Sequence, residues 1–194
     1  HNVPRVFMLV FLVSWFTLAM PSTPVHTQDS PAEAALASVI SDFERILKRA
    51  DPITAGLDGD RDALRRLPDP SRDTELANGR ELSAIGAKLA QISIRDLSSA
   101  SALNHQVLSR AIAEDVEQVG FDFDRIAFQN DDGFHTLGDY LGRTTSIASR
   151  DDADAWLARL NALPAYYSAS IDNLRRGIET RFTQPTIVIS RVLD

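Results

Sequence analysis

Cysteine is absent from the 194-residue chain, which excludes disulfide bonds, thiolate nucleophiles, cysteine metal sites and lipid attachment at an N-terminal cysteine. Glycine and proline are scarce, at nine residues each, so a collagen-like or low-complexity chain is excluded too. The net charge is −7, a sign that opposes binding to phosphate backbones, and we expect no nucleic-acid partner. What is present is an ordinary globular composition, with 44% hydrophobic residues for a core.

A largely apolar run without charge covers residues 6–20, follows Arg5 and gives way to small and polar residues. This is the layout of a secretory signal peptide. A membrane anchor is the alternative, but the run is shorter than the roughly 20 residues that span a bilayer. The sequence therefore predicts a signal peptide over residues 1–27, cleavage between Ser22 and Gln28, a secreted or periplasmic location and no stable membrane anchor after cleavage.

From residue 28 onward, apolar residues recur at steps of three and four, which predicts helices that bury one face. The first helix is expected to begin at residues 29–31, where a capping residue precedes Pro31. It should end at Asp51, because the residue before a proline is disfavoured in the helical conformation. Residues 51–71 are rich in Asp, Gly and Pro and predict a long connection with one helical turn at 63–66.

Two more helices are predicted over residues 74–92 and 98–119, the latter stopped by Gly120. Residues 120–147 are the least regular part, with a short helix at 137–141. The residues expected to face the core in the first three helices are Leu36, Val39, Ile40, Phe43, Ile46, Leu47, Leu82, Ile85, Leu89, Ile92, Leu108, Ile112, Val116 and Val119.

The strongest pattern starts at a capping Ser149 and runs to Phe182, with Pro164 expected to kink the helix. Its periodicity predicts a buried seam and places Arg159 and Asn173 in solvent. The seam comprises Trp156, Leu160, Tyr167, Ile171 and Leu174.

The apolar residues 186–193 indicate the start of another helix, with a strand over 186–192 as the alternative because the run is rich in β-branched residues. An apolar element that has just begun needs a partner, so we expect the domain to be truncated at its C-terminal end. The predicted fold class is all-α: residues 28–194 form a multi-helix array with a long kinked C-terminal helix, as the N-terminal part of a larger helical domain.

Several short stretches together resemble one family, the bacterial domain of unknown function family 885, whose members resemble mainly helical zinc peptidases. The order and spacing of the pieces carry the resemblance, which covers the N-terminal part of such a protein. The pieces are residues 51–57, 67–69, 129–135, 156–164, 173–177, 183–185 and 192–193. The resemblance implies a secreted or periplasmic metal-dependent hydrolase that acts on peptides, with its His-Glu metal signature downstream of this chain.

A helical zinc site needs two imidazoles one turn apart with a nearby carboxylate, and neither His105 nor His135 begins such a run. We expect His105 at the surface or at the edge of the core, no metal site or cofactor in this chain, and zinc only in a full-length protein. No Gly-x-Ser-x-Gly elbow nominates a nucleophile, so no catalytic residue is assigned.

The loop around residue 133 supplies the candidate substrate-cleft residues, Asn130, Gly133 and His135, because loops present polar groups to clefts. An ordinary Asx turn with glycine at positive φ explains the same residues. Two functions remain open: the N-terminal portion of a metal-dependent peptidase-like hydrolase with a peptide-like substrate, or an exported non-catalytic helical module for partner binding or envelope scaffolding.

Overall fold

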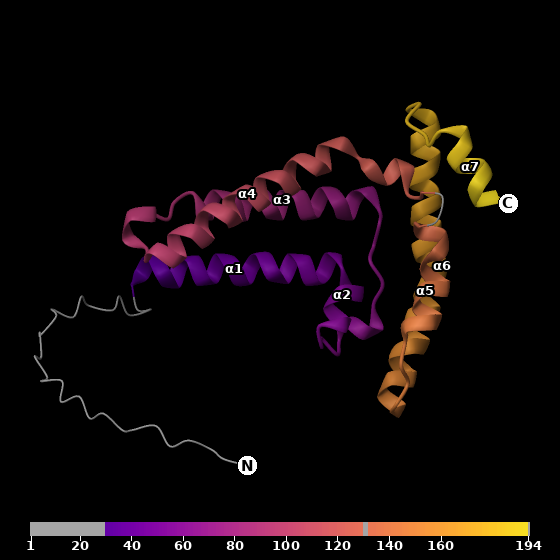
Figure 1. The fold of residues 1–194 in the computed structure, drawn as a ribbon, viewed down its shortest axis with the longest axis horizontal. Helices are drawn as coiled ribbons and strands as arrows, with labels where there is room; N and C mark the ends of the chain where they lie inside the picture. The colour runs from indigo at the N-terminus through magenta and orange to yellow at the C-terminus, as the bar shows by residue number, and fades with distance from the viewer. Residues whose placement is uncertain (1–29, 130–131, 194) are drawn as a thin grey trace, which may run out of the picture.

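The computed structural model describes residues 30–129 and 132–193, and within them it contains seven α-helices, four short 3-10 helices and no strand (Figure 1). The all-α prediction is confirmed. The predicted signal peptide lies outside the described residues. No helix in the described part of the chain is long and apolar enough to cross a membrane. The α-helices are α1 Pro31–Ala50, α2 Pro52–Leu57, α3 Arg72–Leu89, α4 Ser99–Phe121, α5 Leu137–Thr144, α6 Arg150–Glu179 and α7 Thr186–Leu193, and the 3-10 helices are η1 Ala63–Arg65, η2 Ile94–Asp96, η3 Phe123–Ile126 and η4 Phe134–Thr136.

Helices α1, α3 and α4 pack lengthwise into one arm of the molecule (Figure 1). Serine hydroxyls cap their N-termini: Ser30, Ser71 and Ser98 each accept a hydrogen bond from the backbone N–H three residues later. The buried core of this arm is apolar and comes from all three helices, as the helical spacing predicts, but the prediction is wrong for Leu47, which is exposed. The core comprises Leu36, Val39, Ile46, Leu82, Ile85, Leu89, Leu108 and Ile112.

His105 lies inside this core, so its predicted place at the surface or core edge is wrong. Its Nε2 lies 3.0 Å from the carbonyl oxygen of Leu89, which is the end of α3. A buried histidine is tolerated here because the last carbonyl groups of a helix lack partners within their own helix. His105 therefore ties α4 to the C-terminal end of α3.

Several helix boundaries differ from the prediction, and for two of them the structure shows a local reason. Asp51 ends α1 as expected, but its carboxylate also accepts hydrogen bonds from the N–H groups of Ile53 and Thr54 and so starts α2, with Pro52 in the first position. Helix α4 runs through Gly120 and ends at Phe121, because Asp122 adopts the left-handed conformation at φ 52°. The carboxylate of Asp122 binds Arg176 of α6 through two hydrogen bonds, of 2.6 and 3.0 Å.

Helix α6 stands across the end of the arm, with α5 beside it and α7 folding back near its C-terminal end (Figure 1). Residues 186–193 are helical, so the strand alternative is wrong. The long helix passes through Pro164 and ends at Glu179, short of the predicted Phe182.

The face of α6 that packs most closely against the rest of the molecule is not the one that the apolar pattern predicts. Its buried residues are small or polar: Ala155, Arg159, Ser170, Asn173 and Gly177. Small residues allow close approach, since a Cβ on Gly177 would lie 2.6 Å from the carbonyl oxygen of Arg125. Arg159 and Asn173 donate hydrogen bonds to backbone carbonyl groups of neighbouring segments. The Ser170 hydroxyl donates to the carbonyl group of Tyr166 in the same helix. These bonds reduce the usual cost of burying polar groups.

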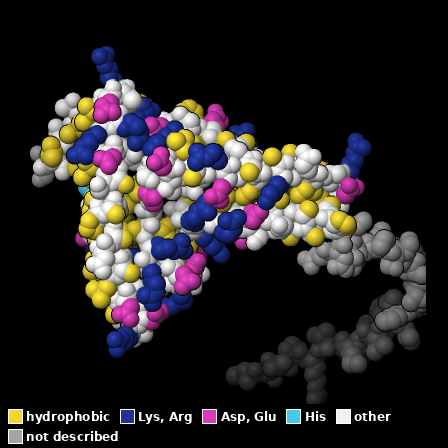
Figure 2. All heavy atoms as spheres, turned by 180° about the vertical axis from the view of Figure 1, so that it is seen from behind, with side chains coloured by type: hydrophobic (Ala, Val, Ile, Leu, Met, Phe, Trp, Pro, Cys, Tyr) yellow, Lys and Arg dark blue, Asp and Glu magenta, His cyan; other side chains and the backbone are white. Residues whose placement is uncertain are grey.

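The predicted seam of α6 is therefore wrong as a buried core. Leu160 and Ile171 are 37% and 41% exposed, and Trp156, Tyr167 and Leu174 are only half-buried. Seen from behind, hydrophobic side chains lie along the column that α6 and α7 form at the left of the molecule (Figure 2). The exposed large hydrophobic residues of these two helices include Leu157, Leu160, Ile171 and Ile178 of α6 and Ile187 of α7, and we call these five residues the apolar stripe.

Candidate functional site

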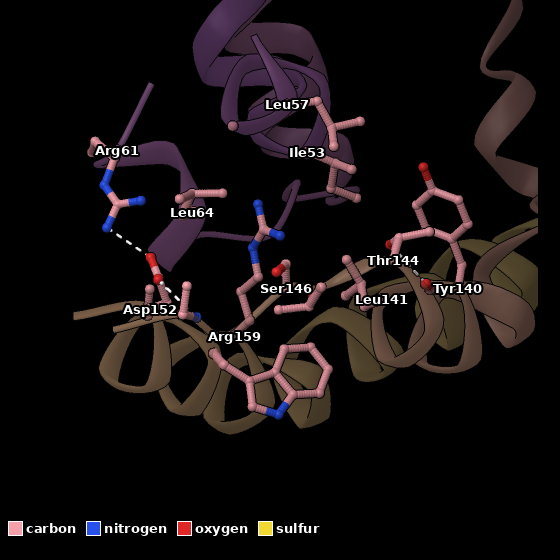
Figure 3. Close-up of a pocket in the computed structure, with 15 residues that line it drawn as sticks. Ile53, Leu57, Arg61, Leu64, Tyr140, Leu141, Thr144, Ser146, Asp152 and Arg159 are labelled. Atoms are coloured by element: carbon pink, nitrogen blue, oxygen red, sulfur yellow. Dashed lines mark hydrogen bonds and ion pairs between the residues drawn. The ribbon is translucent and has the colours of Figure 1, made fainter. Parts of the chain in front are cut away.

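A pocket of about 350 Å³ lies where α2, η1, α5 and α6 meet (Figure 3). We call it the Arg159 pocket, after the charged residue at its base. Its walls carry both apolar side chains and hydroxyl groups, and each of the four elements contributes to them. The lining residues are Ile53, Gly56, Leu57, Arg61, Leu64, Tyr140, Leu141, Thr144, Thr145, Ser146, Ala148, Asp152, Ala155, Trp156 and Arg159.

Arg159 rises from α6 toward α2 (Figure 3), and backbone carbonyl groups hold its side chain. Its Nε donates to the oxygen of Arg66 at 3.1 Å, and its Nη2 donates to those of Pro52 and Ala63 at 3.3 and 3.2 Å. The residue is only 6% exposed. These bonds attach α2 and the segment around η1 to the N-terminal third of α6, and they build the base of the pocket.

The third nitrogen of this guanidinium, Nη1, has no hydrogen bond to any described residue, whereas Nε and Nη2 are bonded. Nη1 also keeps contact with solvent. Among the described residues, the side-chain nitrogen and oxygen atoms that are fully buried without a hydrogen-bond partner belong to His105 and His135, and Nη1 of Arg159 is not one of them. Burial lowers the pKa of Arg159, but a guanidinium remains protonated at neutral pH. The pocket therefore contains a fixed positive charge with one donor nitrogen free.

The other charges at the pocket neutralise one another. Arg61 binds the carboxylates of Asp151 and Asp152 at 2.8 and 2.7 Å, and Arg65 also pairs with Asp151. Hydrogen bonds from the Ser149 hydroxyl and then from Arg61 lower the pKa of Asp152 to about 2. Both carboxylates are thus matched by an arginine, and among the described residues no carboxylate lies within ion-pair distance of Arg159.

A second pocket, of about 790 Å³, adjoins the first and shares Ile53 and Tyr140 with it. Gly133 lines this pocket at φ 143°, where a Cβ would lie 2.5 Å from the Cα of Phe128. The positive φ and the close contact with Phe128 require glycine at position 133. This favours the interpretation of the loop as a turn, and the cleft assignment is a separate question.

His135 does not line this pocket. The ring of His135 packs edge-on against Phe128 and Phe134, with centroids 6.0 and 5.8 Å apart. Asn130 lies outside the described residues. The assignment of Asn130, Gly133 and His135 to a substrate cleft stays a prediction.

Within residues 30–129 and 132–193, no group of three or more His, Cys, Asp or Glu side chains is arranged to hold a metal ion. The charged residue that organises the Arg159 pocket is one that the sequence pattern assigned to solvent. A usable signal was present: Ala155, Ala162, Ser170 and Gly177 repeat at helical spacing on the face of α6 that carries Arg159. A stripe of small residues allows another segment to approach a helix closely, and a charged residue on that face is then buried.

One family matches the chain, over residues 52–194, with the description bacterial protein of unknown function (DUF885). No curated protein and no solved structure matches the chain. The matched region begins at α2 and includes every residue that lines the Arg159 pocket.

Proposed function

The chain belongs to the bacterial family of unknown function DUF885, and from this premise we propose that it forms the N-terminal helical portion of a secreted or periplasmic metal-dependent peptidase-like hydrolase. In this proposal the metal-binding motif lies in sequence downstream of Asp194. The helices described above then supply one wall of the substrate cleft and none of the metal ligands.

The observation that carries the proposal is the apolar stripe of α6 and α7. Ile178 is 69% and Ile187 68% exposed, and Leu160 and Ile171 are also exposed. Leu160, Ile171 and Ile178 fall on one side of α6, at steps of about three and two helical turns. Soluble proteins rarely expose large apolar patches unless another body of protein covers them. A further helical portion of the same protein is the covering body that the family resemblance suggests.

The experiment is to read the gene beyond the codon for Asp194 and to express the longer product. We expect a helix with a His-Glu metal motif, bound zinc, and peptide hydrolysis that stops when a motif histidine is replaced by alanine. Loss of activity with an unchanged circular dichroism spectrum would assign the effect to the metal site. A stop codon after Asp194, or a longer protein without hydrolase activity, would contradict the proposal and favour the helical binding module.

A further inference from the structure

We propose that the Arg159 pocket binds a small carboxylate that carries an apolar side chain, such as an N-acylated apolar amino acid or the C-terminal residue of a peptide. If the proposed function holds, this ligand is a substrate or part of one, and only that step rests on the proposed function. The binding itself is inferred from the described residues alone.

The charge of the pocket is the first step of the argument. The carbonyl groups that hold Arg159 are dipoles and do not cancel its positive charge, and no described carboxylate is paired with it. Buried charges in proteins are ordinarily paired or bind a ligand. The Nη1 nitrogen is also without a hydrogen bond, so an anion in the pocket would accept a charge-assisted hydrogen bond from it.

The shape of the pocket is the second step. A volume of about 350 Å³ lies at the lower end of the range for small-molecule sites, which suits one amino-acid-sized group rather than an extended peptide. Ile53, Leu64 and Trp156 give an apolar wall for a side chain, and the hydroxyl groups of Thr144 and Ser146 give further polar partners. A bare inorganic anion would leave the apolar wall in contact with water.

A purely structural role for Arg159 is the competing explanation, because three of its hydrogen bonds join segments far apart in sequence. That role uses Nε and Nη2 alone. It explains neither the unbonded Nη1 nor the pocket beside it. The two explanations differ in one measurable property, which is affinity for a carboxylate.

Binding is measured by calorimetry on the purified chain at neutral pH, with N-acetyl-leucine as the probe and N-acetyl-leucinamide as its uncharged match. We expect the amide to bind at least about tenfold more weakly, since it loses a charge-assisted hydrogen bond. A tetrapeptide that ends in leucine, compared with its C-terminal amide, shows whether a peptide end is accepted as well as a free acylated amino acid. Equal affinity for acid and amide, no binding of either acid, or inorganic phosphate binding as tightly as N-acetyl-leucine would overturn the assignment.

The variants place the ligand in this pocket. Leu57 lines it and is 66% exposed, so substitution there leaves the bonds of Arg159 intact. Leu57→Glu should weaken binding of N-acetyl-leucine about two- to fivefold and Leu57→Lys should strengthen it similarly, with both effects reduced by salt. Arg175→Gln, an exposed arginine on the same helix, is the matched control and should leave affinity unchanged. Equal affinities for the two Leu57 variants would contradict the assignment.

Arg159→Lys tests the guanidinium directly and should weaken binding at least about tenfold, because lysine lacks the planar fork of donors. Its fold is checked by circular dichroism, and the Leu57 pair keeps the test decisive if this variant unfolds. Carboxylate binding by the chain together with an inactive longer protein would refute the proposed function alone. An active longer protein whose N-terminal portion binds no carboxylate would refute this inference alone.

Discussion

The arm of α1, α3 and α4 and the long helix α6 use opposite chemistry to pack. The arm buries leucine, isoleucine and valine from three helices around one core, whereas α6 buries Arg159, Ser170 and Asn173 and leaves its apolar stripe exposed. In the arm the hydrophobic effect decides which face turns inward. On α6 specific hydrogen bonds to other segments and close backbone approach decide it, so the apolar pattern marks a surface that these helices do not cover.

The largest effect should come from the core of the arm. Leu89 is almost fully buried, and Leu89→Ala should lower the free energy of unfolding by about 2–5 kcal/mol, since it removes apolar contact and leaves a cavity. The measurement is urea unfolding followed by circular dichroism. Leu103→Ala on α4, at an exposed position, is the control and should cost less than about 0.5 kcal/mol. Similar losses for the two leucines would mean that the arm has no specific core.

A smaller effect should come from the polar face of α6. Asn173 is 1% exposed, donates to the carbonyl oxygen of Pro70 at 2.6 Å and accepts from Arg176 at 2.7 Å. Asn173→Ala removes the hydrogen bond to the Pro70 carbonyl group and one of the three side-chain hydrogen bonds of Arg176, and should cost about 1–3 kcal/mol of unfolding free energy. Ile171→Ala on the apolar stripe should cost less, because its side chain is already partly in water. Urea unfolding is the measurement, and a larger loss of unfolding free energy for Ile171→Ala than for Asn173→Ala would contradict the packing of α6 through its polar face.

The smallest effect concerns pH. Partial burial tends to raise the pKa of Asp122, but the hydrogen bond and charge of Arg176, with the charges of Arg72 and Arg125, outweigh it and hold the pKa below the ordinary 3.8. The ionised form is therefore favoured in the folded state, so its contribution is present at neutral pH and is lost as the pH falls below about 4 through the folded-state value.

Asp122→Asn isolates this contribution from the nearby Asp124, whose pKa is raised by burial. At pH 7 the variant should be less stable by about 1 kcal/mol, a figure discounted for solvent screening. The difference from the unsubstituted chain should shrink toward pH 2. Urea unfolding across this range is the measurement, and a constant difference at every pH would show that the loss does not come from the charge.

Local signals in the sequence predicted most helices of this fold. Ser30 before Pro31 marked the start of α1, and the spacing of the core leucines marked the inner faces of α3 and α4. Asp51 and Pro52 carry the same cap-and-proline signal for α2, but a proline at this position also ends α1, and the end of α1 is the only event predicted there. One residue ended one helix and began the next, which periodicity alone does not reveal.

The Arg159 pocket could not be predicted in the same way. Its lining residues extend from Ile53 to Arg159 along the chain, and the hydrogen bonds of Arg159 join segments 93 to 107 residues apart. The spacing of apolar residues predicts which face of a helix would be buried by a hydrophobic neighbour. It does not show whether such a neighbour lies among the described residues. The helix therefore turned its polar face inward, where the partners of Arg159 and Asn173 lie.

The most direct test of this orientation uses the absence of cysteine from the chain. Ser170→Cys and Ile171→Cys each introduce a single thiol at adjacent positions, of which Ser170 is 1% exposed and Ile171 41% exposed. We predict that a maleimide modifies Cys at position 171 at least about tenfold faster than at position 170 in the folded protein, with equal rates in urea. Faster modification at position 170, or equal rates in the folded state, would contradict the packing of α6 through its polar face.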